Sequence, residues 1–315
     1  MLFAGWASKT LANSIAEDMG IQLGQVTMKK FSDGERNLQI RENVRNKHVF
    51  IINSTGPNTQ HFVDLLLLMD AIRGSSAGQM TVIIPYFGYS RQERKDKPHV
   101  PISARVMADC IESQRPSRLI FCDLHSAAIP AFFRTTSDHI YARPIFLDHI
   151  REKFADQLDN MVLVAPDAGA AKISRSYAQR LGVPIAIIDK RRPKENKAEV
   201  MHIVGDVDGK TCIMIDDMID TAGTMTSGAV ALMEHGATGV HAMTTHGVLS
   251  GPALQRINDS PIESVMVTDT VNIGNKQKKC SKIEIVSMAG ILSEAIKRTY
   301  SGESLSALFY CNILL

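Results

Sequence analysis

Short apolar runs alternate with longer amphipathic stretches along the whole chain. The clearest apolar runs are 48–53, 81–85, 118–123, 161–166, 184–189 and 211–216. Short runs rich in Val and Ile are typical of buried parallel strands, and the stretches of helical period between them are typical of crossover helices. The pattern therefore predicts an α/β protein in which mostly parallel central sheets are flanked by helices.

The loops that follow these runs repeat in chemical character. In the first half a helical stretch, a basic loop and an acidic loop follow successive strands, and the second half uses the same order. This repetition predicts one fold used twice, with an N-terminal domain at 1–145 and a C-terminal domain at 146–315. Residues 291–298 predict a final amphipathic helix, which is able to pack back on the N-terminal domain.

Composition excludes several broad classes. The 315 residues are 44% hydrophobic and 22% charged, as in a globular protein, and a net charge of +2 gives no bulk electrostatic reason to bind nucleic acid. The start lacks a secretory leader, and the longest apolar run, 65–69, is too short to cross a membrane. Five cysteines without a Cys-x-x-Cys pair favour reduced thiols. We therefore expect a cytoplasmic protein with no nucleic-acid or membrane partner.

The most informative segment is 211–224, where an apolar strand leads into paired carboxylates and then a small, hydroxyl-rich turn. Asp216 and Asp217 can accept hydrogen bonds from two neighbouring sugar hydroxyls. The turn from Asp220 to Thr224 offers backbone N–H groups at a helix start, which suits a phosphate. An ordinary strand-to-helix connection remains the alternative for an acidic pair alone. The added turn favours a site for a phosphorylated ribose.

Two segments of the first half have the chemistry of a nucleotide site. Residues 31–35 form a glycine-centred turn in which Phe31 could stack on a base, although in isolation the pentapeptide is better explained as a surface turn. Arg91 and Gln92 lie in a basic loop that follows a predicted strand. Arginine in such a loop can bind a polyphosphate through two parallel hydrogen bonds.

Two candidate metal ligands end predicted strands. His125 follows Asp123 at the end of one, and Asp167 ends another. Because Mg²⁺ prefers carboxylates, water and phosphate, Asp167 is the better ligand by chemistry. A second basic loop begins at Lys190, and Lys190 and Arg192 could neutralise charge on a transferring group. A solvated cluster at a sheet edge remains the alternative. No Walker sequence, nucleophile elbow or zinc pattern is present.

The segment from Asp216 to Thr224 resembles the ribose-phosphate loop of the type I phosphoribosyltransferase fold. Several further segments, in this order along the chain, resemble the ribose-phosphate pyrophosphokinase family, and the resemblance extends from 3–5 to 308–309. These segments are 31–35, 91–92, 123–125, 166–167, 190–192, 216–224, 245–247, 250–253 and 267–270.

The resemblance implies two duplicated type I phosphoribosyltransferase-like domains. It also implies Mg²⁺-dependent transfer of the diphosphoryl group of ATP to the 1-hydroxyl of ribose 5-phosphate, which yields phosphoribosyl pyrophosphate and AMP for nucleotide biosynthesis. Residues implied to bind ATP are Phe31, Asp33, Gly34, Glu35, Arg91 and Gln92. Residues implied to bind ribose 5-phosphate are Arg192, Asp216, Asp217, Asp220, Thr221, Ala222, Gly223 and Thr224. The residues implied to act in catalysis are Lys190 and Arg192, and those implied to bind the metal are His125 and Asp167.

The same resemblance implies self-association into a hexamer and allosteric control. Related enzymes that are activated by phosphate and inhibited by ADP use an arginine and serines at subunit contacts, with the adenine turn supplied by a neighbouring subunit. The corresponding positions here are Arg45, Ser76, Ser304 and Ser306.

Two alternatives stay open, one because of a departure from the family pattern and one because other enzymes share the loop from Asp216 to Thr224. Residues 126–131 read Ser-Ala-Ala-Ile-Pro-Ala where the family usually has Ala-x-Gln-Ile-Gln-Gly, so two amides and a glycine are missing beside His125. A catalytically silent, regulatory homologue is therefore one alternative. A phosphoribosyltransferase that consumes the same diphosphate is the other, although it would need neither the turn at Phe31 nor a second domain.

Overall fold

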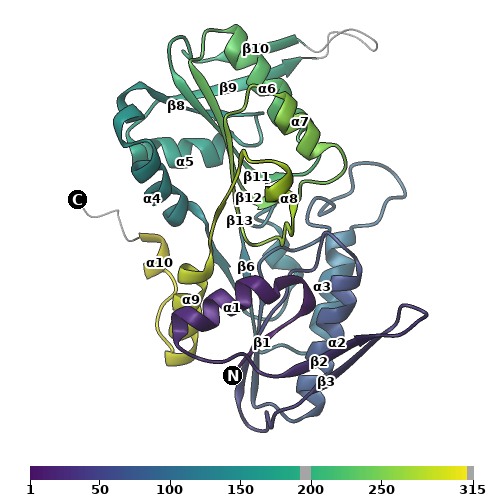
Figure 1. Cartoon of the computed structure of the whole chain (residues 1–315). Coiled ribbons are helices and arrows are strands. Elements are labelled where there is room, and N and C mark those ends of the chain that lie inside the picture. The colour runs from purple at the N-terminus through teal and green to yellow at the C-terminus, as the bar shows by residue number, and fades with distance from the viewer. Residues whose placement is uncertain (192–199, 311–315) are drawn as a thin grey trace. The chain divides into compact units, whose positions relative to one another are not determined.

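The chain divides into two compact units that interleave along the sequence. A computed structural model describes residues 1–191 and 200–310. Unit 1 comprises 1–141, 270–272 and the residues from 287 onward, and unit 2 comprises 142–269 and 273–286 (Figure 1). The division at 141 and 142 precedes the predicted boundary at 145 because the segment that follows is a helix of unit 2. Lys190 lies at the edge of the described residues, and Arg192 lies outside them.

Unit 1 is built on a five-stranded parallel sheet in the order β1-β4-β5-β6-β7. Its strands are β1 (Leu2–Ala4), β4 (His48–Ile52), β5 (Gln79–Ile84), β6 (Arg118–Cys122) and β7 (Ser137–Ile140). An antiparallel hairpin of β2 (Val26–Lys30) and β3 (Arg36–Ile40) forms a separate small sheet. The predicted runs at 48–53, 81–85 and 118–123 are therefore confirmed as strands.

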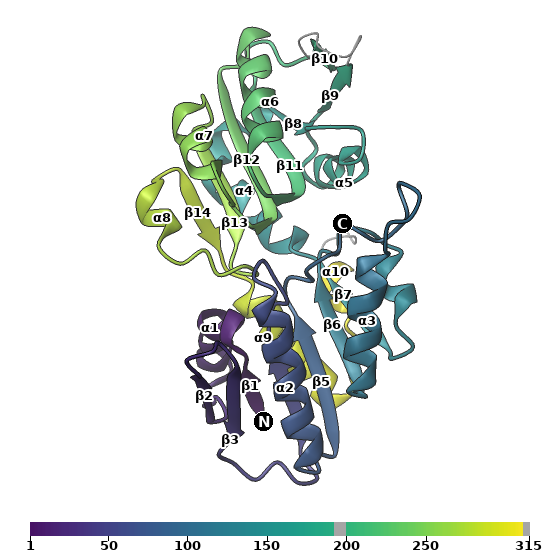
Figure 2. The same cartoon turned by 90° about the vertical axis from the view of Figure 1, so that its right-hand side faces the viewer.

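The helices of unit 1 cover both faces of its sheet. They are α1 (Lys9–Met19), α2 (Gln60–Gly74), α3 (Ser103–Ser113), α9 (Ala289–Ser301) and α10 (Ala307–Tyr310), with short 3-10 turns at η1 (Trp6–Ser8) and η2 (Ile129–Phe132). In Figure 2, α2 and α3 lie in front of the sheet and α9 lies behind it. Buried side chains of α2 and α3 share one core with alternate residues of β4, β5 and β6, as the period of two in strands requires. The helix predicted at 291–298 thus belongs to unit 1.

Unit 2 is built on a seven-stranded sheet in the order β10-β9-β8-β11-β12-β13-β14, in which only β10 runs antiparallel to its neighbour. Its strands are β8 (Met161–Ala165), β9 (Ile185–Arg191), β10 (Val200–Val204), β11 (Thr211–Ile219), β12 (Gly239–Gly247), β13 (Ser264–Thr268) and β14 (Ile283–Val286). The sheet confirms the predicted runs at 161–166, 184–189 and 211–216.

Helices also cover both faces of the sheet in unit 2. They are α4 (Arg143–Lys153), α5 (Ala171–Leu181), α6 (Gly223–Glu234), α7 (Ala253–Asp259) and α8 (Lys276–Lys279), with a 3-10 turn at η3 (Ala155–Asn160). Figure 1 shows α4 and α5 on one side of the sheet and α6 and α7 on the other. Side chains of α6 and α7 pack with alternate residues of β8, β11, β12 and β13. The predicted class, α/β with mostly parallel sheets flanked by helices, is confirmed. None of the helices in the described ranges has the length and apolar character needed to span a membrane.

Strand β11 is longer than the apolar run predicts. Its pairing with β8 ends at Met214, but its pairing with β12 continues to Ile219. The polar residues after Ile215 therefore remain in a strand, because β12 still offers backbone partners where β8 has ended. The paired carboxylates lie on this extension of β11 rather than in a loop.

Candidate active site

Asp216 and Asp217 lie where β11 continues past β8, at the carboxyl edge of a largely parallel sheet. This edge is where open α/β folds bind ligands. Asp216 pairs in register with Thr244 of β12, and its carboxylate accepts a hydrogen bond of 2.9 Å from the Asp217 backbone N–H. Both side chains are half-buried. The extension thus presents two adjacent carboxylates from a hydrogen-bonded strand.

The environment of Asp216 disfavours its negative charge. Burial raises the pKa of the Asp216 carboxyl well above its ordinary value, and the neighbouring charge of Asp217 raises it further. Asp167, from the loop after β8, also contributes to the raised pKa and is therefore near. Three carboxylates in one neighbourhood create a demand for hydroxyl donors or a cation.

The turn from Asp220 to Thr224 connects β11 to α6 and is held by residues from the next loop. Asp220 accepts a hydrogen bond from the Ser250 hydroxyl, and its carbonyl accepts one of 2.8 Å from the Ser250 N–H. Arg256 of α7 donates to the Thr221 carbonyl at 3.0 Å. These contacts fix the turn on the sheet from its outer side.

Backbone conformation at the start of α6 prepares the turn for an anion. Ala222 has a left-handed φ of +61°, which residues other than glycine rarely adopt, and its side chain is buried. No side chain caps α6. The first backbone N–H groups of a helix lack intrahelical acceptors, so those that follow Ala222 can bind an anion where the helix dipole favours one. Gly223 and Thr224 begin the helix and are at least half-exposed.

The remaining residues predicted in unit 2 are only partly described. Asp167 is exposed in the loop between β8 and α5, where its Oδ1 accepts a hydrogen bond of 3.1 Å from the Ala170 N–H. The Lys190 backbone pairs with Met201 of β10, so the strand continues through this residue. Arg192 lies outside the described residues, and the roles of Lys190 and Arg192 stay predictions.

The turn from Phe31 to Glu35 closes the β2–β3 hairpin of unit 1. The Phe31 N–H donates to the Glu35 carbonyl at 2.9 Å, and Gly34 has a φ of +100°, which the turn requires of a glycine. Asp33 Oδ1 accepts a 2.9 Å hydrogen bond from the Glu35 N–H. Phe31 is 50% exposed. A large apolar ring held open by an ordered turn is available to a flat ligand.

Arg91 and Gln92 follow β5 in a loop that is attached to two helices. The Gln92 side chain accepts a hydrogen bond of 2.5 Å from Ser103 at the start of α3. Tyr89 lies 3.2 Å, oxygen to oxygen, from the Thr59 hydroxyl at the start of α2. Gly88 permits the loop to approach Thr55 closely, since an added Cβ would lie 2.9 Å from the Thr55 carbonyl oxygen. The Arg91 and Gln92 side chains are exposed at this anchored position.

His125 is exposed in the loop after β6. The preceding Asp123 is buried with a φ of +33°, and the Leu124 N–H donates to His139 Nε2 at 3.0 Å. The departure at 126–131 folds into an ordered segment, since Ile129 is fully buried and Ser126 accepts a hydrogen bond from the Ala128 N–H. The loop is thus shaped independently of the missing amides. Within the described ranges, no group of three or more His, Cys, Asp or Glu residues could hold a metal by itself.

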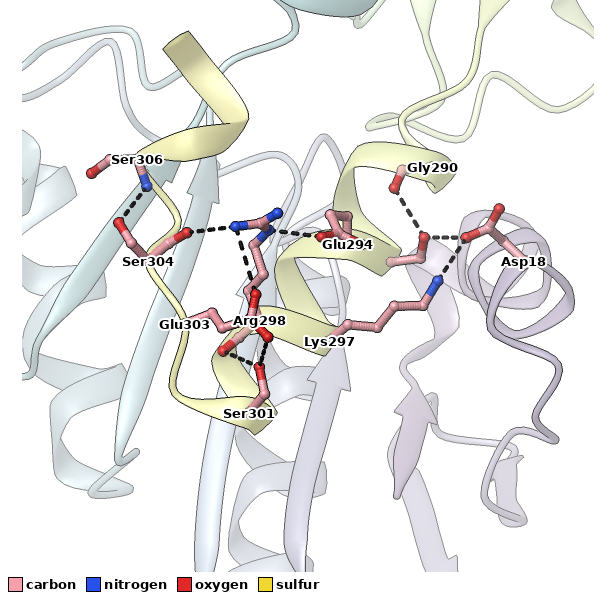
Figure 3. Close-up of polar contacts among 10 residues, drawn as sticks. Asp18, Gly290, Glu294, Lys297, Arg298, Ser301, Glu303, Ser304 and Ser306 are labelled. Atoms are coloured by element: carbon pink, nitrogen blue, oxygen red, sulfur yellow. Dashed lines mark hydrogen bonds and ion pairs between the residues drawn. The ribbon is translucent and has the colours of Figure 1, made fainter. Parts of the chain in front are cut away.

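The four predicted regulatory residues form two pairs within unit 1. Arg45 bridges to Ala77, and the Ser76 carbonyl accepts a hydrogen bond of 2.9 Å from the Asn46 N–H. Ser304 and Ser306 follow α9, where the Ser306 N–H donates to the Ser304 hydroxyl (Figure 3). Arg298 of α9 donates to the Ser304 carbonyl at 3.2 Å. Their regulatory role stays a prediction.

Sequence reasoning missed the residues that hold the candidate loops from outside. Ser250 was recognised only as part of a family-like segment, and Arg256 was not singled out. Nothing in the spacing of Arg256 connects it to Thr221, because the contact joins α7 to a turn more than thirty residues earlier. The sequence signal for Ser250 was only that it follows an apolar strand, and serines in that position are common.

Comparisons with known proteins agree in both halves of the chain. A family model described as the N-terminal domain of ribose phosphate pyrophosphokinase matches residues 1–114, and a phosphoribosyl synthetase-associated domain matches residues 190–310. The ribose-phosphate pyrophosphokinase of Clostridium tetani is 46% identical over 309 residues, covering 98% of this chain and 96% of that one. The protein of the same description from Aquifex aeolicus is 44% identical, with 98% of both chains covered.

A solved structure extends the similarity to the fold. The phosphoribosylpyrophosphate synthetase of Mycobacterium smegmatis superposes with a TM-score of 0.88 and 36% identity, over 96% of this chain and 99% of that one. The predicted phosphoribosyltransferase-like fold class is thereby confirmed.

Proposed function

The chain belongs to the ribose-phosphate pyrophosphokinase family, and we propose that unit 2 holds ribose 5-phosphate while unit 1 supplies the ATP-binding segments. The family's reaction transfers the diphosphoryl group of ATP to the 1-hydroxyl of ribose 5-phosphate. The anomeric oxygen forms a bond to the β-phosphorus of ATP. The bond between the β-phosphorus and the oxygen that bridges it to the α-phosphate breaks, and the hydroxyl proton is released. Phosphoribosyl pyrophosphate and AMP result. The catalytic function is favoured over a silent regulatory role.

One observation carries the acceptor half of this proposal: the carboxylates of β11 are followed directly by an uncapped helix start. Asp216 and Asp217 accept hydrogen bonds from the ribose hydroxyls, and these bonds stabilise the charged form of Asp216 that burial disfavours. The turn from Asp220 to Thr224 receives the 5-phosphate on the N–H groups of α6. A sugar phosphate is thus bound at both ends by one continuous segment.

In unit 1, Phe31 stacks on adenine at the tip of the β2–β3 hairpin. Asp33, Gly34 and Glu35 maintain the turn and bind the edge of the base. Arg91 and Gln92 bind the nucleotide further along, from a loop that Ser103 and Thr59 hold in place. Lys190 and Arg192 stabilise the charge on the transferring group, because such reactions depend on positioning and charge neutralisation more than on covalent chemistry.

The donor set fits Mg²⁺. This ion keeps several waters and binds through one or two carboxylates together with substrate phosphates, so it needs no complete protein cage. Asp167, which lies near Asp216 of β11, would hold one ion in unit 2, and His125 would serve a magnesium site in unit 1. When bound, the ion neutralises charge on the transferring phosphates. Asp167 and His125 would each orient an ion at the site that they serve.

The proposal also covers where the protein acts, how it assembles and how it is regulated. None of the described cysteines, Cys110, Cys122, Cys212 and Cys280, forms a disulfide, which suits the reducing cytoplasm. The protein assembles as a hexamer, as the resemblance implies, and the adenine turn of one subunit is supplied to a neighbouring subunit. Arg45, Ser76, Ser304 and Ser306 bind the allosteric effectors at the subunit contacts.

The function is tested by following AMP from pure protein, Mg-ATP and ribose 5-phosphate. AMP must form only when both substrates and Mg²⁺ are present. Folded protein that yields no AMP at saturating substrate with added phosphate would establish the silent homologue instead. A Lys190→Ala variant is expected to lose most turnover, and near-full turnover would refute the role given to Lys190.

A further inference from the structure

Arg36 links the β2–β3 hairpin to the body of unit 1. It is the first residue of β3, directly after the turn from Phe31 to Glu35, and it pairs in register with Lys30 of β2. Two like charges directly opposite each other destabilise a hairpin unless a third group compensates them. The structure supplies such a group in helix α2.

Asp64 of α2 forms an ion pair with Arg36, with Nε and Oδ1 3.2 Å apart. The pair is desolvated, since the side chains of Arg36 and Asp64 are only 12% and 3% exposed. The hydrogen-bond angle of this contact is poor, because Arg36 Nε makes no hydrogen bond to any described residue in spite of the short distance. Asp64 Oδ2 also makes no hydrogen bond to a described residue. Gln60 donates to Asp64 Oδ1 at 3.4 Å. Burying such a pair costs desolvation energy, so the pair adds little net stability.

Trp6 completes the cluster. The guanidinium carbon of Arg36 lies 4.2 Å from the centroid of the Trp6 ring, in the geometry of a cation–π contact. Trp6 comes from η1, so the hairpin, η1 and α2 meet at one arginine. The same helix α2 holds the Arg91 loop through Thr59, one helical turn and a residue before Asp64. Both proposed ATP-binding segments are therefore attached to the first turns of α2.

We propose that Arg36, held between Asp64 and Trp6, is a positioning residue that sets the orientation of the adenine-binding turn. This inference rests on the proposed function, because it assigns Phe31 to the ATP base. Without the Arg36 contacts the hairpin keeps its own hydrogen bonds but loses its fixed angle to α2. Binding of ATP then weakens, whereas ribose 5-phosphate, which is held in unit 2, is unaffected.

A double variant separates positioning from stability. Arg36→Met with Asp64→Leu replaces the ion pair by apolar side chains, a change that folded proteins often tolerate. We expect a melting temperature near that of the wild type, a KM for ATP raised about threefold to tenfold, and an unchanged KM for ribose 5-phosphate. The matched control is Arg118→Met with Asp138→Leu, which removes a half-buried ion pair between β6 and β7 of the same unit. It is expected to leave both KM values unchanged.

The proposal is overturned if the folded double variant keeps the wild-type KM for ATP, or if both KM values rise together. Trp6→Leu provides a second test that leaves the ion pair in place, and its half-exposed site tolerates substitution. It must also raise the KM for ATP alone. An unchanged KM in folded Trp6→Leu equally overturns the proposal.

Fluorescence supplies a readout that does not depend on turnover. Trp6 is the single tryptophan of the chain, so its emission reports the cation above its ring. Removing Arg36 must shift the emission spectrum, and identical spectra for wild type and double variant would refute the contact. If the wild type forms no AMP, the proposed function fails while these spectra still test the contact. If it forms AMP and the variants keep their affinity for ATP, only the present inference fails.

Discussion

At the scale of single residues, Asp216 shows how a binding group can work against folding. Its carboxyl has a raised pKa because of burial and the charges of Asp217 and Asp167. The folded state therefore binds more protons than the unfolded state between the ordinary pKa and the raised one. In that window stability falls as pH rises. At neutral pH the empty protein must protonate this side chain on folding or hold its buried charge, and either state costs folding free energy.

Asp216→Asn is consequently expected to raise the free energy of unfolding at pH 7 by roughly 1–3 kcal/mol while abolishing most activity. Denaturant unfolding without Mg²⁺ or substrate measures the first effect, and AMP formation measures the second. Asp159→Asn, at an exposed aspartate of the same unit, is the control and should change stability by less than about 0.5 kcal/mol. A less stable Asp216→Asn protein would contradict the argument.

His241 in β12 makes stability depend on pH in the opposite direction. Burial, and then the positive charge of Lys153, lower the pKa of its imidazole to about 4, although Glu284 acts in the other direction. Its Nδ1 lies 2.9 Å from the Ser264 hydroxyl, its Nε2 faces Glu263 at 3.7 Å, and Phe154 packs edge-on against the ring. Between pH 4 and its ordinary pKa, the unfolded state binds the extra proton. Stability is therefore full above this window and is lost as pH falls through it.

His241→Phe should reduce the loss of stability between pH 7 and pH 5 by about 1–2 kcal/mol, because the imidazole no longer has to be held neutral. Chemical denaturation at the two pH values measures this difference. His202→Phe, at an exposed histidine of β10, serves as the control. Equal slopes in wild type and His241→Phe would exclude His241 as the group responsible.

At the scale of elements, the junction of β11 and α6 combines a stiff strand with a strained turn. The strand continues along β12 to Ile219, and Ala222 then adopts a left-handed conformation before the helix begins. Such a conformation costs roughly 1–2 kcal/mol in an L-residue. The buried Ala222 side chain and the Ser250 contacts to Asp220 hold it there.

Ala222→Val is expected to lower stability by about 2 kcal/mol or more, because a β-branched residue is still less compatible with a positive φ. It should also raise the KM for ribose 5-phosphate more than that for ATP. Thermal melts and initial rates provide the two measurements. Ser227→Val, at an exposed position inside α6, introduces the same side chain with ordinary helical geometry and should have little effect on either. Similar losses in both variants would remove the case for strain at Ala222.

At the scale of the whole molecule, unit 1 is assembled from the two ends of the chain. Helix α9 packs against α1, burying Leu292, Ala295 and Ile296. Figure 3 shows Lys297 of α9 directed at Asp18 of α1, with its nitrogen 3.7 Å from the carboxylate. The Ser293 hydroxyl of α9 donates a hydrogen bond to the same carboxylate. Unit 1 therefore depends on residues that follow the whole of unit 2 in the sequence.

Deleting the chain from Ala289 onward is expected to cost unit 1 about 3–6 kcal/mol, since the burial of Leu292 and Ile296 alone is of that size. This is a large share of the stability of an ordinary domain. Deletion from Ala307 onward, which spares α9, is the control. Circular dichroism and Trp6 emission during heating distinguish the two proteins. A well-folded unit 1 without α9 would contradict this account.

The six strands predicted from apolar runs are confirmed, because such β-branched runs depend on local pattern, and the site motifs were predicted at their ends. The other strands of the two sheets and the hairpin were not predicted from the pattern. It underestimated β11, because residues such as Asp216 and Met218 stay in the strand only through β12, which lies later in the chain. The sequence pattern could not predict the Arg36 cluster for the same reason, because Trp6, Arg36 and Asp64 are far apart in sequence. Contacts between distant segments leave no period or motif to read.

The late position of α9 also has a consequence in time. Ribosomes add about 5–20 residues per second, so roughly 7 to 30 s pass between the synthesis of residue 141 and that of residue 287. Throughout that interval the apolar face of α1, including Leu11 and Ile15, has no α9 to cover it. Unit 2 can complete its sheet first, although it begins later. The nascent chain is therefore most open to chaperones, and to aggregation, at its oldest end.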